Sequence, residues 1–432
     1  MLNLLCSFVS VLKTVGYVLL AFVVLMFMVM IHETGHYTAG KILGFQINEF
    51  SIGMGPKIFS KKKKNGEVFS LRLLPLGGFC AFEGEDEDKD NPRAFNNQKP
   101  WKRLIVLFSG AFFNFVSAIL IAIIAFSCYG DTVAKISTVY DYAPEQNQQL
   151  QSGDVIYKIN GKRVFVLDNI SRYMSDKEMT FTVLRPNGDG KYDTVELRGV
   201  KKHEFVSALV SKIDFEVAPV DGRELQVKDT IYKLNGVSLS QKGDFALQLN
   251  AAVAAGLETC TVTVSDGEKT YDYAVPTSVL AGSSFAIAES AYSGVGMSIH
   301  YEKYRFGFGE SLLRAVPYCG EVGMLVLRTL GGLITGVVGI DQVGGPITTI
   351  SMTSQIVATG FGNVLALIVL ISVNLAVFNL LPVPALDGCR MVFVIIEWIA
   401  GKPVNRKVEA WINGVGLVLL IILMVVIDLL KL

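Results

Sequence analysis

Four stretches of this chain carry no charged side chain over at least 18 residues, and they limit the possible folds more than any other feature. They comprise residues 14–31, 104–130, 364–381 and 410–427. A helix needs about 20 mostly apolar residues to cross a bilayer, so we expect four membrane-spanning helices. Lys13 is the only basic residue before the first stretch, and no small-residue cleavage site follows it, so we do not expect a cleavable signal peptide.

The composition agrees with a membrane protein that also has a water-exposed insert. Apolar residues make up 51% of the 432 residues and charged residues only 18%, whereas soluble domains carry about 25% charge. The formal net charge is zero, which gives no indication of nucleic-acid binding. The six cysteines are far apart and form no C-x-x-C pair, so neither a disulfide framework nor a zinc finger is indicated.

The basic residues predict the orientation in the membrane. Twelve Lys and Arg residues lie in segment 41–103 and four in segment 389–409, so both segments should face the cytoplasm. Both termini and residues 131–304 are then expected to be extracytoplasmic.

Segment 44–78 is predicted to form a β-hairpin rather than a helix. Apolar residues alternate on either side of Asn65-Gly66, a strong hairpin signal. Strands near lipid need pairing or protein cover for their backbone groups. The run 61–64 of four lysines is then the solvated tip of the hairpin, and contact with anionic lipid headgroups is the alternative.

The insert contains an internal repeat, because residues 150–161 match residues 225–236 at eight positions with a constant offset of 75. Such a repeat indicates one compact unit used twice. Its pattern resembles PDZ domains, which bind peptides by adding a strand to a sheet edge. Peptide or protein partners and a purely steric role are both consistent with this pattern.

Residues 305–340 predict an amphipathic helix in the membrane interface. Glu310, Arg314, Glu321 and Arg328 fall on one narrow stripe, and the rest of the helix surface is apolar. Pro317 lies on the same stripe and is expected to kink the helix. A buried helix of the insert is the alternative.

These observations predict a multi-pass α-helical membrane protein with four transmembrane helices, a membrane-associated β-region and two extracytoplasmic PDZ-like α+β domains. The expected parts are the first span (1–40), the β-region and loop (41–103), the second span (104–130), two PDZ-like domains (131–205 and 206–299), the interfacial helix (305–340), the third span (360–388), a cytoplasmic link (389–409) and the fourth span (410–430).

The sequence His32-Glu33-Thr34-Gly35-His36 suggests a zinc site. On a helix, positions i and i+4 share a face, so His32 and His36 can bind one Zn²⁺, and Glu33 can accept a proton from its water. Ionisable groups at the end of a span are costly unless they have a function. A structural salt-bridge cluster is the alternative. His203 and His300 have no such neighbours and are expected to be ordinary surface residues.

Catalytic zinc has three protein ligands, and Asp387 is the candidate for the third. It lies near the end of segment 379–388, at the inner end of the third span. The two histidines lie at the inner end of the first span, so all three side chains are expected at the same depth in the membrane. Pro382 and Pro384 interrupt the helix and leave backbone amide and carbonyl groups free before Asp387. A simple helix cap is the alternative role for Asp387.

Together these motifs resemble the site-2 protease family of intramembrane zinc metalloproteases, and the tandem PDZ-like insert resembles its bacterial RseP type. The resemblance covers nearly the whole chain. Residues 50–55 and 74–79 are similar to the family's membrane-reentrant β-region, and residues 345–347 to an element before the third span. Two positions depart from the family pattern, namely Cys389 in place of a second glycine and Ala111 in place of a common proline. Neither is a proposed ligand.

The resemblance implies that His32, His36 and Asp387 bind Zn²⁺ and that Glu33 is the catalytic acid and base. It further implies a role for a set of residues in holding the substrate backbone or the oxyanion. This set comprises Asn374, Asn379 and Asn114, to which we add Pro382 and Pro384.

The expected function is intramembrane cleavage of single-span proteins, such as anti-sigma factors or remnant signal peptides, in the bacterial cytoplasmic membrane. Transmembrane substrates and the lipid bilayer are the expected partners. One alternative is a non-proteolytic membrane scaffold that recruits partners through its PDZ pair. Another is a membrane zinc protease that acts on soluble or prenylated peptides. That type uses a glutamate as third ligand, and no convincing downstream glutamate motif is present, because Glu397 follows the Asp-Gly pair and is expected to cap or face the cytoplasmic link.

Overall fold

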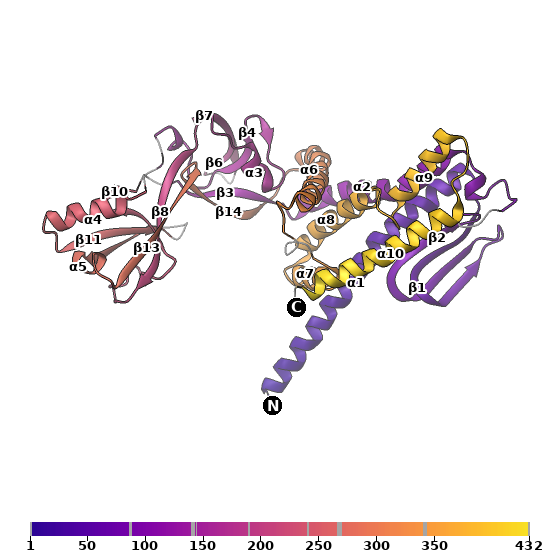
Figure 1. Ribbon diagram of the computed structural model, residues 1–432, viewed down its shortest axis with the longest axis horizontal. Coiled ribbons are helices and arrows are strands. Elements are labelled where there is room, and N and C mark those ends of the chain that lie inside the picture. The colour runs from indigo at the N-terminus through magenta and orange to yellow at the C-terminus, as the bar shows by residue number, and fades with distance from the viewer. Residues whose placement is uncertain are drawn as a thin grey trace. The chain divides into compact units, whose positions relative to one another are not determined.

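The computed structural model describes residues 2–85, 89–139, 143, 145–188, 191–239, 242–265, 270–339 and 344–430. The chain forms two compact units, Met1–Asp131 with Arg305–Leu432, and Thr132–Tyr304 (Figure 1). The first unit contains α1 (Leu2–Leu43), β1 (Ile47–Lys62), β2 (Val68–Phe82), α2 (Pro100–Cys128), α6 (Phe308–Thr335), α7 (Pro346–Ala358), α8 (Phe361–Asn379), α9 (Asp387–Ala400) and α10 (Arg406–Leu429).

Among the described residues, four helices are long and apolar enough to cross a membrane. They are Val15–Leu43 of α1, Pro100–Cys128, Phe361–Asn379 and Arg406–Leu429. Their length and composition confirm the prediction of four spans. The predicted link 389–409 is not simply a connection, because α9 occupies most of it. The sequence predicts no membrane-spanning helix in this segment, because charged residues of the amphipathic helix α9 interrupt its apolar residues.

The predicted hairpin is present but more elaborate than expected. Residues 49–52 of β1 pair on one side with 68–71 of β2 and on the other side with 78–81. Residues 59–62 of β1 pair with the outer side of 68–71. The two bent strands therefore lie as four adjacent segments, with residues 78–82 at one edge.

Glycine makes the bend in β1 possible. Gly53 has φ +80°, a conformation that residues with a side chain rarely adopt. A Cβ atom there would lie 2.6 Å from the carbonyl oxygen of Leu74. The strand can therefore turn back on β2 only because this position has no side chain.

Small residues also bring α1 and α2 together next to the histidines. A Cβ atom on Gly35 would lie 2.3 Å from the carbonyl oxygen of Ser109. The two helix backbones are thus closer than any larger residue at position 35 would allow, as is typical of tightly packed membrane helices.

Helix α7 is an element that the sequence analysis did not predict. Its first turn is capped from α10, because Asp428 accepts hydrogen bonds from the backbone N–H and the hydroxyl of Thr348, at 3.2 and 2.8 Å. Gly345 leaves room for this contact, since a Cβ atom there would lie 2.5 Å from the Asp428 carboxyl carbon. The carboxylate therefore meets the positive end of the α7 dipole.

Helix α6 has the polar stripe of the predicted amphipathic helix, and this stripe faces the protein. Arg314 is buried and donates hydrogen bonds to Asp131 at 2.9 and 3.0 Å. Leu313 and Val316 are more than half exposed on the outer surface. The helix packs against α2 and α8, so it belongs to the membrane unit and not to the insert, contrary to the alternative. Residue 340, the end of the predicted range, lies outside the described residues. An interfacial position in the membrane stays a prediction.

The second unit contains two six-stranded sheets, each with its own hydrophobic core. The first has β14 (Met297–Tyr304), β3 (Asp131–Val139), β4 (Val155–Ile159), β6 (Met179–Pro186) and β7 (Tyr192–Val200) in spatial order, with β5 (Lys162–Arg163) on β4 and helix α3 (Asp168–Tyr173). The second has β12 (Thr270–Pro276), β11 (Thr259–Ser265), β9 (Thr230–Leu234), β8 (His203–Ile213) and β13 (Phe285–Gly294), with β10 (Val237–Ser238) on β9 and helices α4 (Asp244–Ala254) and α5 (Thr277–Leu280).

The internal repeat corresponds to the same hairpin in both sheets. Asn160 and Asn235 both have φ +52°, and the glycines that follow them have φ +75° and +77°. This is the conformation that an Asn-Gly turn favours.

The boundaries of the two domains differ from the predicted ranges 131–205 and 206–299. Strand β14 pairs with β3 in the first sheet, although it follows all strands of the second sheet in the sequence. The second sheet is therefore inserted in the sequence between β7 and β14 of the first. The sequence repeat marks only the central hairpin of each copy and therefore could not reveal the returning strand. Identity with PDZ domains stays a prediction.

Candidate metal centre

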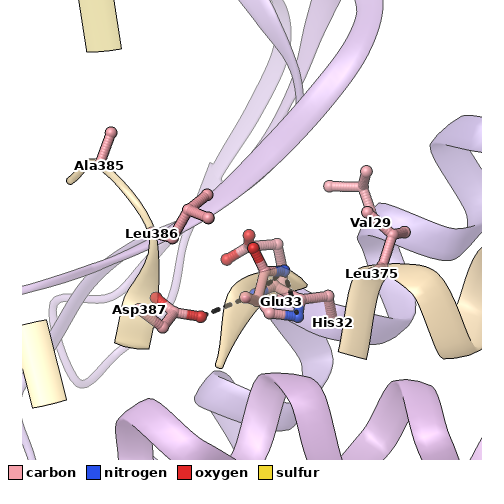
Figure 2. Close-up of a pocket in the computed structure, with 8 residues that line it drawn as sticks. Val29, His32, Glu33, Leu375, Ala385, Leu386 and Asp387 are labelled. Atoms are coloured by element: carbon pink, nitrogen blue, oxygen red, sulfur yellow. Dashed lines mark hydrogen bonds and ion pairs between the residues drawn. The ribbon is translucent and has the colours of Figure 1, made fainter. Parts of the chain in front are cut away.

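Three side chains from distant parts of the sequence meet at the C-terminal half of α1. The Nε2 atoms of His32 and His36 lie 3.1 Å apart, and Asp387 Oδ2 lies 3.0 and 3.2 Å from them. Figure 2 shows Asp387 directed at His32, with Glu33 beside it. Tetrahedral zinc with ligand distances of about 2.1 Å separates its ligand atoms by roughly 3.4 Å, so the three atoms have close to the spacing that zinc requires.

The hydrogen bonding of His36 supports the same interpretation. Its Nδ1 lies 2.8 Å from the carbonyl oxygen of Val106, which can only accept a hydrogen bond. His36 therefore carries its proton on Nδ1, and in the neutral ring Nε2 is a bare acceptor. A bare nitrogen that faces a carboxylate oxygen repels it, so the contact calls for either a metal ion or a second ring proton between the two atoms. The donor set, two imidazoles and one carboxylate, is one that Zn²⁺ prefers.

Gly110 on α2 keeps the space around the two histidines open. A Cβ atom at this position would lie 2.5 Å from His36 Nε2 and 2.8 Å from His32 Nε2. Any side chain here would collide with the atoms proposed to bind the metal. The absence of a side chain at position 110 is thus part of the site.

The structure brings two of the three predicted asparagines to His32. The amide nitrogens of Asn114, on α2, and Asn379, at the end of α8, both lie 3.4 Å from His32 Nδ1. Ser372 fixes this arrangement by donating to the Asn114 carbonyl oxygen at 2.8 Å. Asn374 does not line the cavity around the histidines, although its Oδ1 is buried without a hydrogen-bond partner among the described residues.

The loop before Asp387 is held in a strained conformation by α10. Ala385 has φ +73° and donates its backbone N–H to Asn413 Oδ1 at 3.1 Å. Pro384 packs against Gly416, where a Cβ atom would lie only 2.0 Å from the proline. Left-handed backbone at alanine costs about 1–2 kcal/mol, and the surrounding contacts offset this cost. Pro384 thus helps to hold the loop against α10, whereas Pro382 is exposed.

The edge of the hairpin lies beside Glu33. The Cys80 backbone lies next to the Glu33 carboxylate, and a Cβ atom on Gly78 would lie 3.6 Å from Glu33 Cγ. Burial raises the pKa of the Cys80 thiol, so this side chain is a neutral thiol here, and it is not part of the cluster of His32, His36 and Asp387.

Two cavities meet at these side chains and share His32, Glu33, Ala385 and Asp387. One has a volume of about 300 Å³ and is called here the aliphatic cavity (Figure 2). The other, of about 380 Å³, is lined by the hairpin residues 79–82 and is called the hairpin cavity. The atoms proposed to bind the metal are therefore accessible from two directions.

The sequence of this chain matches known proteases over nearly its whole length. Residues 20–423 match Peptidase family M50. The chain belongs to this family. It is 30% identical to the zinc metalloprotease RasP of Bacillus licheniformis over 93% of this chain and 94% of that protein. It is also 25% identical to the regulator of sigma E protease of Haemophilus influenzae, over 96% and 98%.

Membership of the family makes the chain a zinc metalloendopeptidase in a membrane and removes the scaffold alternative. The structure also gives no support to a glutamate as third ligand. Glu397 is buried but pairs with Arg103 and Arg406, and the cluster suited to a metal consists of His32, His36 and Asp387 within the described residues. His203 and His300 lie in β8 and β14 of the second unit.

Several residues of the site were not identified from the sequence. Some depend on a close approach between helices, and others on partners that are distant in the sequence. They are Gly110, the Val106 carbonyl, Asn413, and the pair Glu85 and Arg390. Gly110 lies four residues before the predicted site residue Asn114, on the same helix α2, so its position was a signal in the sequence.

The ion pair between Glu85 and Arg390 connects the hairpin edge to the helix of Asp387. Arg390 Nη1 contacts Glu85 Oε1, and Glu85 Oε2 accepts a hydrogen bond from the Phe82 backbone N–H at 3.2 Å. Arg390 lies one turn after Asp387 on α9. This pair therefore links the edge segment 78–82 to the helix that carries Asp387, one of the residues proposed to bind the metal.

We expect Glu85→Arg and Arg390→Glu each to lower cleavage by about tenfold, because each leaves two like charges facing one another. The double exchange should recover most of the loss. The measurement is kcat/KM for the four proteins, with Glu196→Arg and Arg198→Glu on the surface as a matched control pair. Equal losses in the double and single variants would show that the ion pair does not position the edge.

Proposed function

We propose that this protein is an intramembrane zinc endopeptidase whose metal is held by His32, His36 and Asp387. The observation that carries the proposal is the convergence of these three side chains with Glu33, between helices apolar enough to cross a membrane. Membership of Peptidase family M50 supports it.

The side chains suggest how a peptide bond would be cut. Zinc, when bound, polarises a water molecule and lowers its pKa to near 7. Glu33 accepts the proton of this attacking water and delivers it to the leaving amide nitrogen. The Cys80 backbone, which lies next to the carboxylate, helps to hold it in place for both transfers. Asn379 lines the cavity beside His32, which supports a role for its amide N–H in stabilising the developing oxyanion.

We propose a single transmembrane helix as substrate. Its peptide bonds are hydrogen-bonded within the helix, and breaking these bonds in lipid exposes polar groups at a cost of several kcal/mol each. Within the described parts of the chain, the edge segment 78–82 pairs with β1 on one side only. An unwound substrate can add to its other side as a strand and recover the lost hydrogen bonds next to Glu33. Substrates with helix-breaking residues should therefore be favoured.

The proposed location is a bacterial cytoplasmic membrane, with the metal centre toward the cytoplasm and Thr132–Tyr304 outside. The basic residues in 41–103 and 389–409 support this orientation. Anti-sigma factors and remnant signal peptides are the proposed substrates, and the name of the Haemophilus relative is consistent with the first class.

The metal dependence can be tested on purified protein in lipid nanodiscs with a single-span test protein. We expect cleavage to stop after chelation and to return with about one equivalent of Zn²⁺. Cleavage that persists in metal-free protein would refute the proposal.

We propose that the second unit excludes substrates with bulky extracytoplasmic domains. Replacing 132–304 by a flexible linker should leave cleavage of a short, trimmed substrate within about twofold, because no described residue of this unit lines the cavities. The same deletion should allow an untrimmed substrate to be cut. Gel-based cleavage of both substrates measures this, and loss of short-substrate cleavage with zinc still bound would indicate direct recruitment instead.

A further inference from the structure

The two cavities at the metal-binding side chains differ in chemical character. The walls of the aliphatic cavity beyond His32, Glu33, Asn379 and Asp387 are formed by Val29, Leu375, Leu386 and Ala385. Val29 precedes Glu33 by one turn of α1, and Leu375 precedes Asn379 by one turn of α8. The cavity therefore extends from the metal-binding atoms toward the N-terminal ends of both helices, between apolar side chains.

The hairpin cavity, in contrast, is lined by the edge segment and by charged groups. It contains residues 79–82 of β2 together with Glu85 and Arg390. Among the side chains that the structure describes, none from β2 lines the aliphatic cavity. A substrate strand paired with the edge segment therefore occupies the hairpin cavity with its backbone. A side chain of this substrate strand that lies at the metal centre and points away from the hairpin is directed into the aliphatic cavity.

We infer that the aliphatic cavity is a specificity subsite that accepts one leucine-sized aliphatic side chain directly next to the scissile bond. This inference rests on the proposed function. The side chains of Val29, Leu375 and Leu386 provide no hydrogen-bond partner for a polar group. The carboxylates of Glu33 and Asp387 at the inner end repel an acidic side chain. The subsite thus selects both for apolar character and for size.

The test uses a synthetic single-span peptide of leucine and alanine with a central Asn-Pro pair, in detergent. The cut is located by mass spectrometry, and the residue on each side of it is then changed to Gly, Leu, Phe or Asp. At one of the two positions, kcat/KM should be higher for Leu than for Gly by about tenfold or more, and Asp should be cut slowest. Dissociation constants of the same peptides for zinc-loaded Glu33→Gln protein provide a second readout.

Two variants change the size of the subsite in opposite directions. Val29→Ala should raise the Phe/Leu ratio of kcat/KM by about tenfold, because it enlarges the cavity. Leu375→Phe should lower the rate for Leu to that for Gly, because it fills the cavity. The matched control is Val23→Ala, at a position on α1 that is 51% exposed, and it should leave all ratios unchanged.

The outcomes separate this inference from the proposed function. If wild-type protein cuts no transmembrane peptide, the proposed function is wrong. If it cuts the peptides and the Phe/Leu ratio is the same in wild type, Val29→Ala and Leu375→Phe, the proposed function stands and the subsite does not exist.

Discussion

Glu33→Gln is expected to reduce cleavage by at least about 10²–10⁴-fold while zinc stays bound. The substitution keeps the size and position of the side chain and leaves His32, His36 and Asp387 in place, but an amide cannot accept the proton of the attacking water. Measurement of zinc content and of kcat on the same purified sample separates the loss of chemistry from the loss of metal.

The matched control for this experiment is Glu224→Gln, which makes the same chemical change at an exposed position of the second unit. It should keep full activity. If Glu33→Gln retained more than about a tenth of wild-type activity with zinc bound, Glu33 would not be the proton acceptor.

Asp387→Ala should lose both metal and activity. Removing one of three ligands leaves only the two histidines, and because loss of an outer hydrogen-bond partner alone costs about 10–100-fold in metal affinity, loss of a ligand should cost more than about 100-fold. Competition with a zinc chelator of known affinity gives the dissociation constant.

Asp272→Ala serves as the control, since Asp272 lies in β12 of the second unit, away from the cavities. Zinc affinity of Asp387→Ala equal to that of wild type would place the third ligand elsewhere.

The main features of the fold were predictable from local sequence patterns. Charge-free runs identify helices that cross a membrane, and Asn65-Gly66 identifies the hairpin turn. The spacing of His32 and His36 depends only on the pitch of a helix. Each of these signals lies within one segment, so no knowledge of distant contacts is needed to interpret it.

Features that depend on partners distant in the sequence were not predictable. The hairpin bends because Gly53 approaches Leu74, and α7 begins where Asp428 of α10 reaches it. The returning strand β14 is recognised only by its pairing in the first sheet. Asn114 and Asn374 were proposed on equal grounds, yet only the former contacts His32, because the direction of a side chain on a helix depends on how the helix packs.

The measurement that tests the account most directly is the position of the cut in a single-span protein reconstituted with the zinc-loaded enzyme in nanodiscs, determined by mass spectrometry. We predict a cut within the apolar span of the substrate, and no cut with Glu33→Gln. A cut confined to the water-exposed segments that flank the span would contradict the account.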